Sequence, residues 1–238
     1  MRSTIVIIFF LAATTLYSNC VRAQTYNVKK IKPGIITING KGNAGAWKNA
    51  NILSSFIYPW EKTDAPATSF SALWDGQWLY LLYIAKDDSV NVYVNKNEKR
   101  EIGASDRVEI FFKIDDKMEP YYCLEMDASA RVLDYTASYY RQMHYEWQWP
   151  KDQLIVKTSK TTDGYVLEAA ISIVSLKQLG LINNNQLQAG LFRAESKQLD
   201  AGMQNLHWIS WIDPKTAKPD FHIPAAFGIL KLEGSAEY

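Results

Sequence analysis

Three carboxylates lie on two alternating segments that follow one another in the sequence. Glu109 belongs to residues 106–114, and Glu125 and Asp127 belong to residues 121–127. In both segments the acidic residues alternate with apolar ones, so they point away from the predicted core. Such a group suits sugar hydroxyls, a cation or the acid and base of a glycosidase. The pattern alone favours the plainer interpretation, a solvated polar face.

Three further residues combine with these carboxylates as candidate ligand contacts. Arg193 follows an apolar segment and suits a buried carboxylate such as Glu109 as well as it suits a ligand. Phe221 follows the polar, proline-containing residues 218–220, which predicts an exposed ring, and His222 suits loop hydrogen bonding or ligand contact equally. Small-ligand sites mix apolar rings with a few placed polar groups. The candidate ligand contacts are therefore Glu109, Glu125, Asp127, Arg193, Phe221 and His222.

Other chemistries lack support in the sequence. The histidines His144, His207 and His222 form no short metal-ligand spacing with each other or with Cys123, which argues against a zinc site. No G-x-S-x-G, P-loop or G-x-G-x-x-G motif occurs, so nothing indicates a serine hydrolase or a nucleotide cofactor. We interpret Cys123 as a half-buried strand residue rather than a catalytic thiol.

The elements that must position these residues are short strands. Residues 69–74 and 78–85 are β-rich runs separated by an Asp-Gly turn, and residues 154–159 and 165–171 flank a second one. Further strands are predicted at residues 131–136, 187–195, 206–212 and 227–232. One helix is predicted at residues 172–180, because Ser172 can cap it and Gly180 can end it.

Turn signals recur about every ten residues. This spacing predicts an all-β fold, an antiparallel β-sandwich of the jelly-roll or immunoglobulin type with one short helix. The longest unassigned stretches are residues 86–105 and the aromatic-rich residues 137–152. Long loops of this kind typically cover or line a site.

Composition restricts the partners. The 238 residues include 26 Lys+Arg and 25 Asp+Glu, a near-balance that argues against nucleic-acid binding. Aromatic residues make up 13% of the chain, with 8 Trp, 14 Tyr and 9 Phe, more rings than a modest core readily hides. No linker or internal repeat divides the chain, so a single domain is expected.

The first 23 residues have the pattern of a secretory signal peptide. Arg2 precedes an apolar run at residues 5–13, too short to span a bilayer, and Val21-Arg22-Ala23 offers a cleavage site before Gln24. We expect residues 24–238 to be exported to the periplasm or the medium. A lipoprotein signal using Cys20 fits less well, because residues 17–19 lack the leucine and small residues of its motif. Cleavage removes two arginines and turns the net charge of +1 into −1, which favours an uncharged sugar over a polyanion.

Several segments, in order, resemble family 9 carbohydrate-binding modules. The resemblance runs from about residue 70 to the end, with weaker agreement from Trp47. The matching segments are W-D-G-Q-W-L-Y (74–80) followed by Asp87-Asp88, D-R-V-E-I-F (106–111) with residues 121–127 where the next strand is expected, G-Y-V-L-E-A-A-I (164–171), S-W-I-D-P (210–214), and residues 221–228 with their P-A-A-F-G ending.

The resemblance implies a β-sandwich, often with bound calcium, that holds sugar between two aromatic rings. Glu109 matches the acidic ligand of that family, while Glu125 and Asp127 fall where an arginine and an asparagine bind sugar. Phe221 falls at one clamp ring. The other ring falls near Gly103, so Trp147, Trp149 or a loop tyrosine would have to supply it.

A structural calcium ion is the one cofactor that the resemblance adds. The acidic pairs Asp87-Asp88 and Asp115-Asp116 could contribute ligands, although acidic pairs at strand ends are usually solvated turns.

The leading hypothesis is an exported, non-catalytic protein that binds a sugar or oligosaccharide and serves polysaccharide capture or breakdown. It predicts no membrane span and no nucleic-acid partner, and is compatible with association with the cell envelope. One alternative is a glycoside hydrolase that uses two of the carboxylates. The other is an adhesion domain whose residues 139–149 dock a protein partner.

Overall fold

The structure is a computed structural model that describes residues 24–197 and 206–234. The predicted signal peptide, with Cys20, lies outside the described residues. Within those residues, no helix combines the length and the apolar character needed to cross a membrane.

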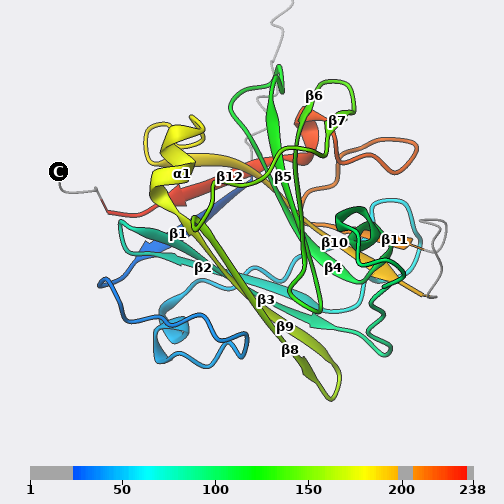
Figure 1. Ribbon diagram of the computed structural model, residues 1–238, viewed down its shortest axis with the longest axis horizontal. Coiled ribbons are helices and arrows are strands. Elements are labelled where there is room, and N and C mark those ends of the chain that lie inside the picture. The colour runs from blue at the N-terminus through cyan, green and yellow to red at the C-terminus, as the bar shows by residue number, and fades with distance from the viewer. Residues whose placement is uncertain (1–23, 198–205, 235–238) are drawn as a thin grey trace, which may run out of the picture.

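Twelve strands make up the sheet in the described part of the chain (Figure 1). They are β1 (Thr25–Lys30), β2 (Thr68–Trp74), β3 (Trp78–Lys86), β4 (Arg107–Lys113), β5 (Tyr121–Asp127), β6 (Val132–Ser138), β7 (Gln142–His144), β8 (Leu154–Thr161), β9 (Gly164–Ser172), β10 (Gln186–Ser196), β11 (Leu206–Ser210) and β12 (Gly228–Leu232). Their order is β7-β6-β5-β4-β10-β12-β1-β2-β3-β9-β8, and β11 pairs with β10. The all-β prediction is confirmed.

Strand β1 joins the two halves of this sheet. Its first residues pair with β12 and its last two, Lys29 and Lys30, pair with β2, in both cases in parallel. The sheet therefore curls at β1 and encloses the main core, to which Phe70 and Leu167 contribute from one half and Ile110 and Leu191 from the other. The prediction of antiparallel strands is wrong only at β1, and a jelly-roll or immunoglobulin-like sandwich stays a prediction.

Both predicted hairpins are present. Strands β2 and β3 pair around Gly76, whose φ of 91° favours glycine, while the Asp75 carboxylate accepts the backbone N–H groups of Gln77 and Trp78. Strands β8 and β9 pair around Gly164, where an added Cβ would lie 1.9 Å from the carbonyl oxygen of Ala85.

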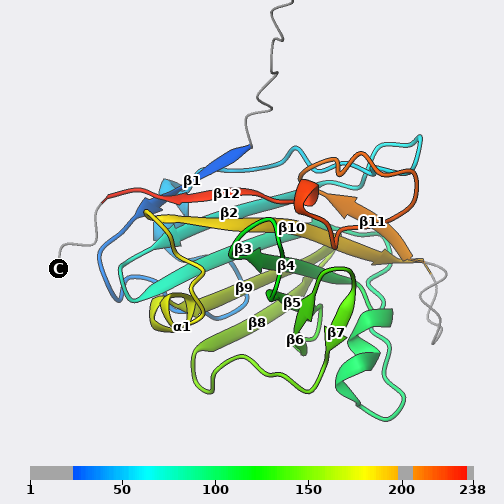
Figure 2. The ribbon, with the colours of Figure 1, turned by 90° about the horizontal axis from the view of Figure 1, so that it is seen from above.

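The predicted helix is present as α1 (Ile173–Gln178). The Ser172 hydroxyl accepts the Val174 N–H at 3.2 Å, and Gly180 follows the helix with a φ of 71°. Within residues 24–197 and 206–234, three 3-10 helices were not predicted: η1 (Gly45–Asn49), η2 (Lys99–Ala104) and η4 (Pro224–Ala226). In Figure 2 the blue-green segment with η2 lies beside β5 and β6.

A second apolar cluster lies on the face of β4, β5, β6 and β10 that points away from the main core. In β4, Ile110 faces the main core and Phe111 faces this second cluster, as the alternation of the strand requires. Cys123, Tyr135 and Phe192 join Phe111 there. Cys123 is completely buried rather than half-buried, and burial raises the pKa of its thiol, so it belongs to the packing.

Candidate functional site

A cavity of about 310 Å³ opens on this second face. Strands β4, β5, β6, β7 and β11 contribute side chains, and η2, the turn after β6 and residues 219–222 complete the lining. Its volume is in the range of small-ligand pockets, about 300–1,000 Å³. The lining residues that carry the argument below are Arg107, Glu109, Glu125, Tyr145, Trp208 and Phe221.

An ion cluster lies in the buried part of the cavity. Glu109 and Glu125 face each other across the paired strands β4 and β5. The Arg107 Nε lies 2.9 Å from Glu109 Oε1 and 2.7 Å from Glu125 Oε2, and Tyr135 donates its hydroxyl to Glu125 at 2.8 Å. Glu109 is 1% exposed and Glu125 is 7% exposed. The prediction of a solvated face is therefore wrong, because loops and aromatic rings cover this side of the sheet.

The cluster is not fully satisfied by the protein. Neither Arg107 Nε nor Glu109 Oε1 has a well-aligned hydrogen-bond partner, although the two atoms lie at ion-pair distance. Burial raises the pKa of Glu109; the Arg107 charge opposes this shift and the Glu125 charge adds to it. Buried polar atoms without aligned partners are uncommon and suit an incoming hydroxyl.

Phe221 forms part of the apolar wall. Its ring stacks on Phe192 with centroids 4.2 Å apart, and the edge of Trp208 packs at 5.7 Å. Because residues 219–222 fold onto the sheet, Phe221 is only 5% exposed. The prediction of an exposed ring is wrong, yet the ring does lie beside the carboxylates in one cavity.

His222 lies next to Phe221 and lines the same cavity. Its Nδ1 is 2.9 Å from the Tyr121 hydroxyl and its ring lies against Phe111. Burial, helped by the Arg141 charge and opposed by Asp220, lowers the pKa of His222 to about 4. The imidazole is therefore neutral near pH 7.

Gly103, where the family resemblance places a second clamp ring, also lines the cavity. The aromatic side chains Tyr145 and Trp208 line the same cavity. Tyr145 comes from the aromatic-rich stretch, whereas Trp147 and Trp149 from the same stretch pack against the main core. Of the three candidates for the second ring, Trp147, Trp149 and a loop tyrosine, the structure therefore brings only a loop tyrosine, Tyr145, to the cavity.

Sequence reasoning missed Arg107, Tyr135 and Trp208. Arg107 is two residues before Glu109, so it lies on the same face of β4, a signal that was available. Its guanidinium carbon also lies 5.4 Å from the centroid of the Trp208 ring. Trp208 was not predicted because β11 contains no acidic residue that would have indicated a polar site beside it.

Asp127 does not line the cavity. Its carboxylate accepts the N–H groups of Ser129 and Arg131 at 2.9 and 3.0 Å, and pairs with the Arg131 side chain at 2.7 Å. It organises the turn between β5 and β6, an ordinary role for aspartate at this position.

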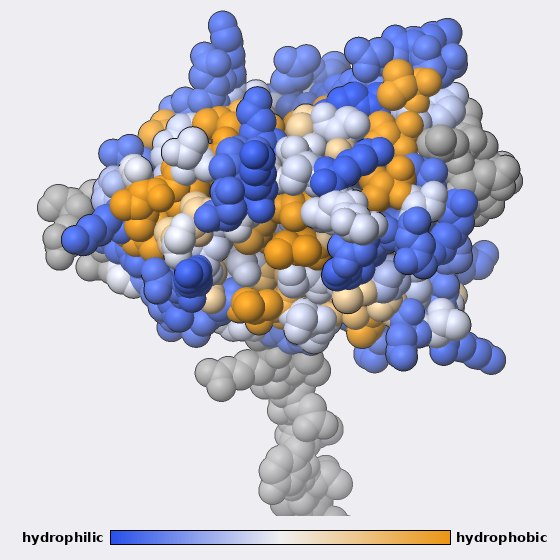
Figure 3. Space-filling model, turned by 90° about the horizontal axis from the view of Figure 1, so that it is seen from below, coloured by the Kyte–Doolittle hydropathy of each residue, from blue (hydrophilic) through white to orange (hydrophobic). Residues whose placement is uncertain are grey.

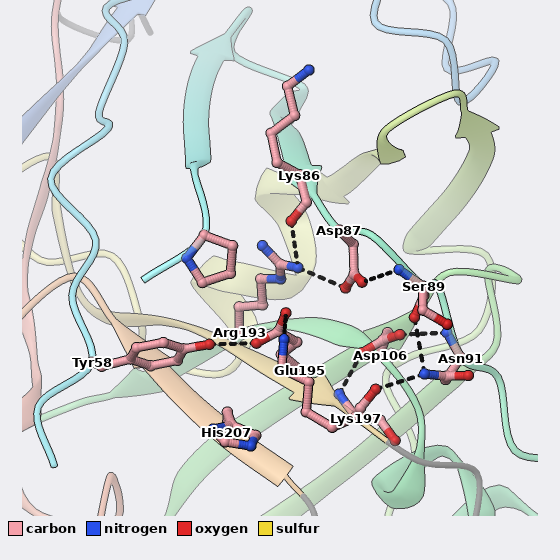
Figure 4. Close-up of polar contacts among 12 residues, drawn as sticks. Tyr58, Lys86, Asp87, Ser89, Asn91, Asp106, Arg193, Glu195, Lys197 and His207 are labelled. Atoms are coloured by element: carbon pink, nitrogen blue, oxygen red, sulfur yellow. Dashed lines mark hydrogen bonds and ion pairs between the residues drawn. The ribbon is translucent and has the colours of Figure 1, made fainter. Parts of the chain in front are cut away.

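Arg193 lies on the opposite face of the sheet from Glu109. It is paired in register with Val108, so its side chain enters the space between the two halves (Figure 4). There its Nη2 contacts Asp87 at 2.8 Å and its Nη1 donates to Thr68 at 3.0 Å. Arg193 therefore does pair with a buried carboxylate, but that carboxylate is Asp87 and not Glu109, because odd and even residues of β10 face opposite sides.

At least one member of each acidic pair considered for calcium has protein partners. Asp87 accepts the Ser89 N–H and the Arg193 guanidinium, and Asp116 pairs with Lys113. Over residues 24–197 and 206–234, no group of three or more His, Cys, Asp or Glu side chains is arranged to hold a metal ion. Calcium binding therefore stays a prediction.

Solved structures share this fold at low sequence identity. A putative carbohydrate-binding protein from Bacteroides uniformis ATCC 8492 aligns with a TM-score of 0.66 and 20% identity, covering 89% of this chain and all of that one. A family 9 carbohydrate-binding module from Caldicellulosiruptor kristjanssonii in complex with cellotriose gives 0.58 and 20%, covering 90% and 96%. The same kind of module in complex with glucose gives 0.56 and 21%, covering 90% and 98%.

No curated protein matches the chain. The family model described as "Carbohydrate family 9 binding domain-like" matches residues 38–235, nearly all of the described chain. The match starts upstream of the sequence motifs and includes the strands that build the cavity. The chain therefore belongs to the carbohydrate family 9 binding domain-like family.

Proposed function

We propose that this protein binds a sugar or oligosaccharide in the cavity over β4, β5 and β6 without transforming it. The observation that carries the proposal is the cluster of Arg107, Glu109 and Glu125 buried beside aromatic rings. Sugar hydroxyls can donate to the carboxylates and accept from the guanidinium, and the C–H face of a pyranose can pack on Trp208 or Tyr145. Family membership supports the same ligand class.

Glucose and short glucose oligosaccharides are the first ligands to test. The two similar modules from Caldicellulosiruptor kristjanssonii hold cellotriose and glucose. Polar groups in this cavity can accept and donate to such hydroxyls, so cellotriose serves as the reference probe.

The direct test is the Glu109→Gln variant, assayed by calorimetry with cellotriose and a panel of other oligosaccharides. The substitution removes a charged hydrogen-bond acceptor, so affinity falls by about tenfold or more. Glu168→Gln is the matched control. Glu168 is also a fully buried carboxylate, but it bonds Trp47 and the backbone of Gly40 under the N-terminal loop. Unchanged affinity in Glu109→Gln, or an equal loss in both variants, contradicts the proposal.

Glycoside hydrolysis is a second candidate, favoured by one observation. Glu109 and Glu125 contact the same nitrogen of Arg107, so their carboxyl groups lie close together, and the pKa of Glu109 is raised by burial. A close pair of carboxyl groups is the arrangement of retaining glycosidases. Release of reducing sugar by the wild-type protein, abolished in Glu109→Gln, would establish an enzyme; binding without release establishes a binding domain.

Docking of a protein through residues 139–149 is less well supported. Tyr139 and Tyr140 are about half-exposed, but the tryptophans of the stretch pack inward. Seen from below (Figure 3), apolar residues lie in separate patches among polar and charged ones. Large continuous apolar patches are what protein interfaces typically present.

Export is part of the proposal. Residues 1–23 direct the chain to the periplasm or the medium, where it serves polysaccharide capture or breakdown, either free or at the cell envelope. Sequencing the N-terminus of the mature protein tests this: a start at Gln24 supports signal-peptidase cleavage, and a lipidated start at Cys20 replaces it with membrane anchoring.

We also propose a structural calcium ion, on the basis of the family resemblance alone. A bound ion stabilises the folded state, so a chelator lowers the melting temperature if the ion is present. An unchanged melting temperature removes calcium from the account.

A further inference from the structure

Two arginines in the lining of the cavity have guanidinium groups with unused donors. Arg100, from η2, is exposed and lies over the Tyr145 ring, 4.7 Å from its centroid; within the described residues it has no ion pair. Arg141, in the turn between β6 and β7, has a 43% exposed side chain, and its Nη1 is 3.8 Å from Asp220. That separation exceeds a hydrogen bond.

Asp220 does not neutralise this pair of arginines. Its carboxylate already accepts the Tyr140 hydroxyl at 2.5 Å and the His222 N–H at 3.0 Å. Asp220 is one carboxylate against two guanidinium groups in the exposed part of the lining. This part of the cavity therefore keeps an excess of positive charge.

The charges of Arg100 and Arg141 both influence the Tyr145 hydroxyl. Burial raises the pKa of Tyr145 and the Glu125 charge adds to this shift, whereas Arg100 and Arg141 both oppose it. Tyr145 shares the cavity lining with both arginines and with Glu125, and the Arg100 guanidinium lies directly over its ring. It marks the boundary between a cationic outer part and a carboxylate-containing inner part.

The charges of the cavity are thus segregated by depth. The inner part holds Glu109 and Glu125 around Arg107, which suits hydroxyl groups and disfavours an anion. The outer part holds Arg100 and Arg141, whose planar, forked donors match carboxylate and sulfate oxygens. A neutral sugar would use the inner part alone.

We propose, on the basis of the proposed function, that the bound carbohydrate is acidic and places a carboxylate or sulfate group against Arg100 and Arg141 while its hydroxyls contact Glu109 and Glu125. The near-neutral charge of the whole chain, which favoured an uncharged sugar, does not describe this local field. Both anionic groups share the chemistry that the guanidinium pair recognises.

Matched ligands separate the outcomes. Gluco, galacto and manno sugars are titrated by NMR as the neutral sugar, the uronate, the uronate methyl ester and the 6-sulfate. Within the series that binds, the uronate or the sulfate binds about tenfold more tightly than the neutral sugar, and the tighter of the two identifies the anionic group. The difference in affinity between the acidic and the neutral sugar decreases as salt is added, because the charges of Arg100 and Arg141 are solvent-exposed and screened.

Equal affinity for uronate, methyl ester and neutral sugar overturns this inference and leaves the proposed function intact. Failure of every sugar, neutral or acidic, together with failure of the wider oligosaccharide panel, overturns the proposed function itself.

Two variants locate the anionic group. Arg100→Gln and Arg141→Gln each lower affinity for the acidic ligand several-fold and lower affinity for the neutral sugar much less. Lys160→Gln is the charge-matched control, because Lys160 is exposed on strand β8 in the other half of the sheet. The assignment is contradicted if the Lys160 variant loses its preference for the acidic ligand, or if the two arginine variants keep theirs.

Discussion

At the residue scale, the wall of the cavity and the packing of the second apolar cluster are the same side chains. Phe221 stacks on Phe192 and touches Trp208, so one ring face supports the fold while the residue also lines the cavity. Loss of this ring therefore affects stability and binding together.

Phe221→Ala lowers the free energy of unfolding by about 3–5 kcal/mol, because it empties a buried aromatic site. Urea unfolding measures the loss. Tyr139→Ala is the control: that ring is 44% exposed, and its removal changes stability by no more than about 0.5 kcal/mol. A Phe221 variant as stable as the wild type would mean that the ring is free of the cluster.

His222 makes stability depend on pH. Its pKa is about 4 in the folded protein, lowered first by burial, against 6.5 as the ordinary value. Between these values the unfolded chain takes up a proton that the native imidazole lacks, so stability is lost as the pH falls from 6.5 to 4.

The His222→Gln variant isolates this dependence. Glu109 and Asp106, whose pKa values burial raises, act in the opposite direction and are present in both proteins. The stability of the variant relative to wild type therefore improves as the pH falls from 6.5 to 4, measured by urea unfolding at each pH. A constant difference over that range contradicts a neutral, buried His222.

The sequence predicted the residue-scale site in part. Glu109, Glu125, Phe221 and His222 do share one cavity, and alternation on adjacent strands was sufficient to bring the two glutamates together. The burial of these side chains was not predictable from alternation, because the pattern of a strand does not show whether a loop from elsewhere in the chain covers its outer face. Arg193 was misplaced because its facing depends on the register of β10.

At the element scale, the hairpins position the strands and their glycines set the turns. Hairpin and helix boundaries were predicted within a few residues, since Asp-Gly turns and a Ser cap act locally. Strand β1 was missed because it gains its order from distant partners, β12 and β2. Propensity does not encode such long-range pairing.

Two turn glycines give a matched prediction. Gly76→Ala costs about 1–2 kcal/mol, because φ is 91° but no atom lies within 4 Å of the new Cβ. Gly164→Ala costs more, because its Cβ would meet the carbonyl oxygen of Ala85 at 1.9 Å and part β3 from β9. Urea unfolding compares them, and equal losses would show that backbone conformation alone sets the cost.

At the scale of the whole molecule, one curled sheet serves two purposes on its two faces. The face between the halves holds the main core, and the opposite face of β4, β5, β6 and β10 holds the second cluster and the cavity. The all-β class followed from the turn spacing, whereas the closure through β1 depends on pairings across nearly the full length of the chain. The paired strands β4 and β5 under the cavity fix the relative positions of Arg107, Glu109 and Glu125.

The most direct test of the central claim is a crystal structure of residues 24–238 with the oligosaccharide that binds most tightly in a glycan array. The account predicts a sugar in the cavity, with hydroxyls within hydrogen-bond distance of Glu109 and Glu125 and a ring face against Trp208 or Tyr145. A sugar bound elsewhere on the molecule, with the cavity empty, would contradict it.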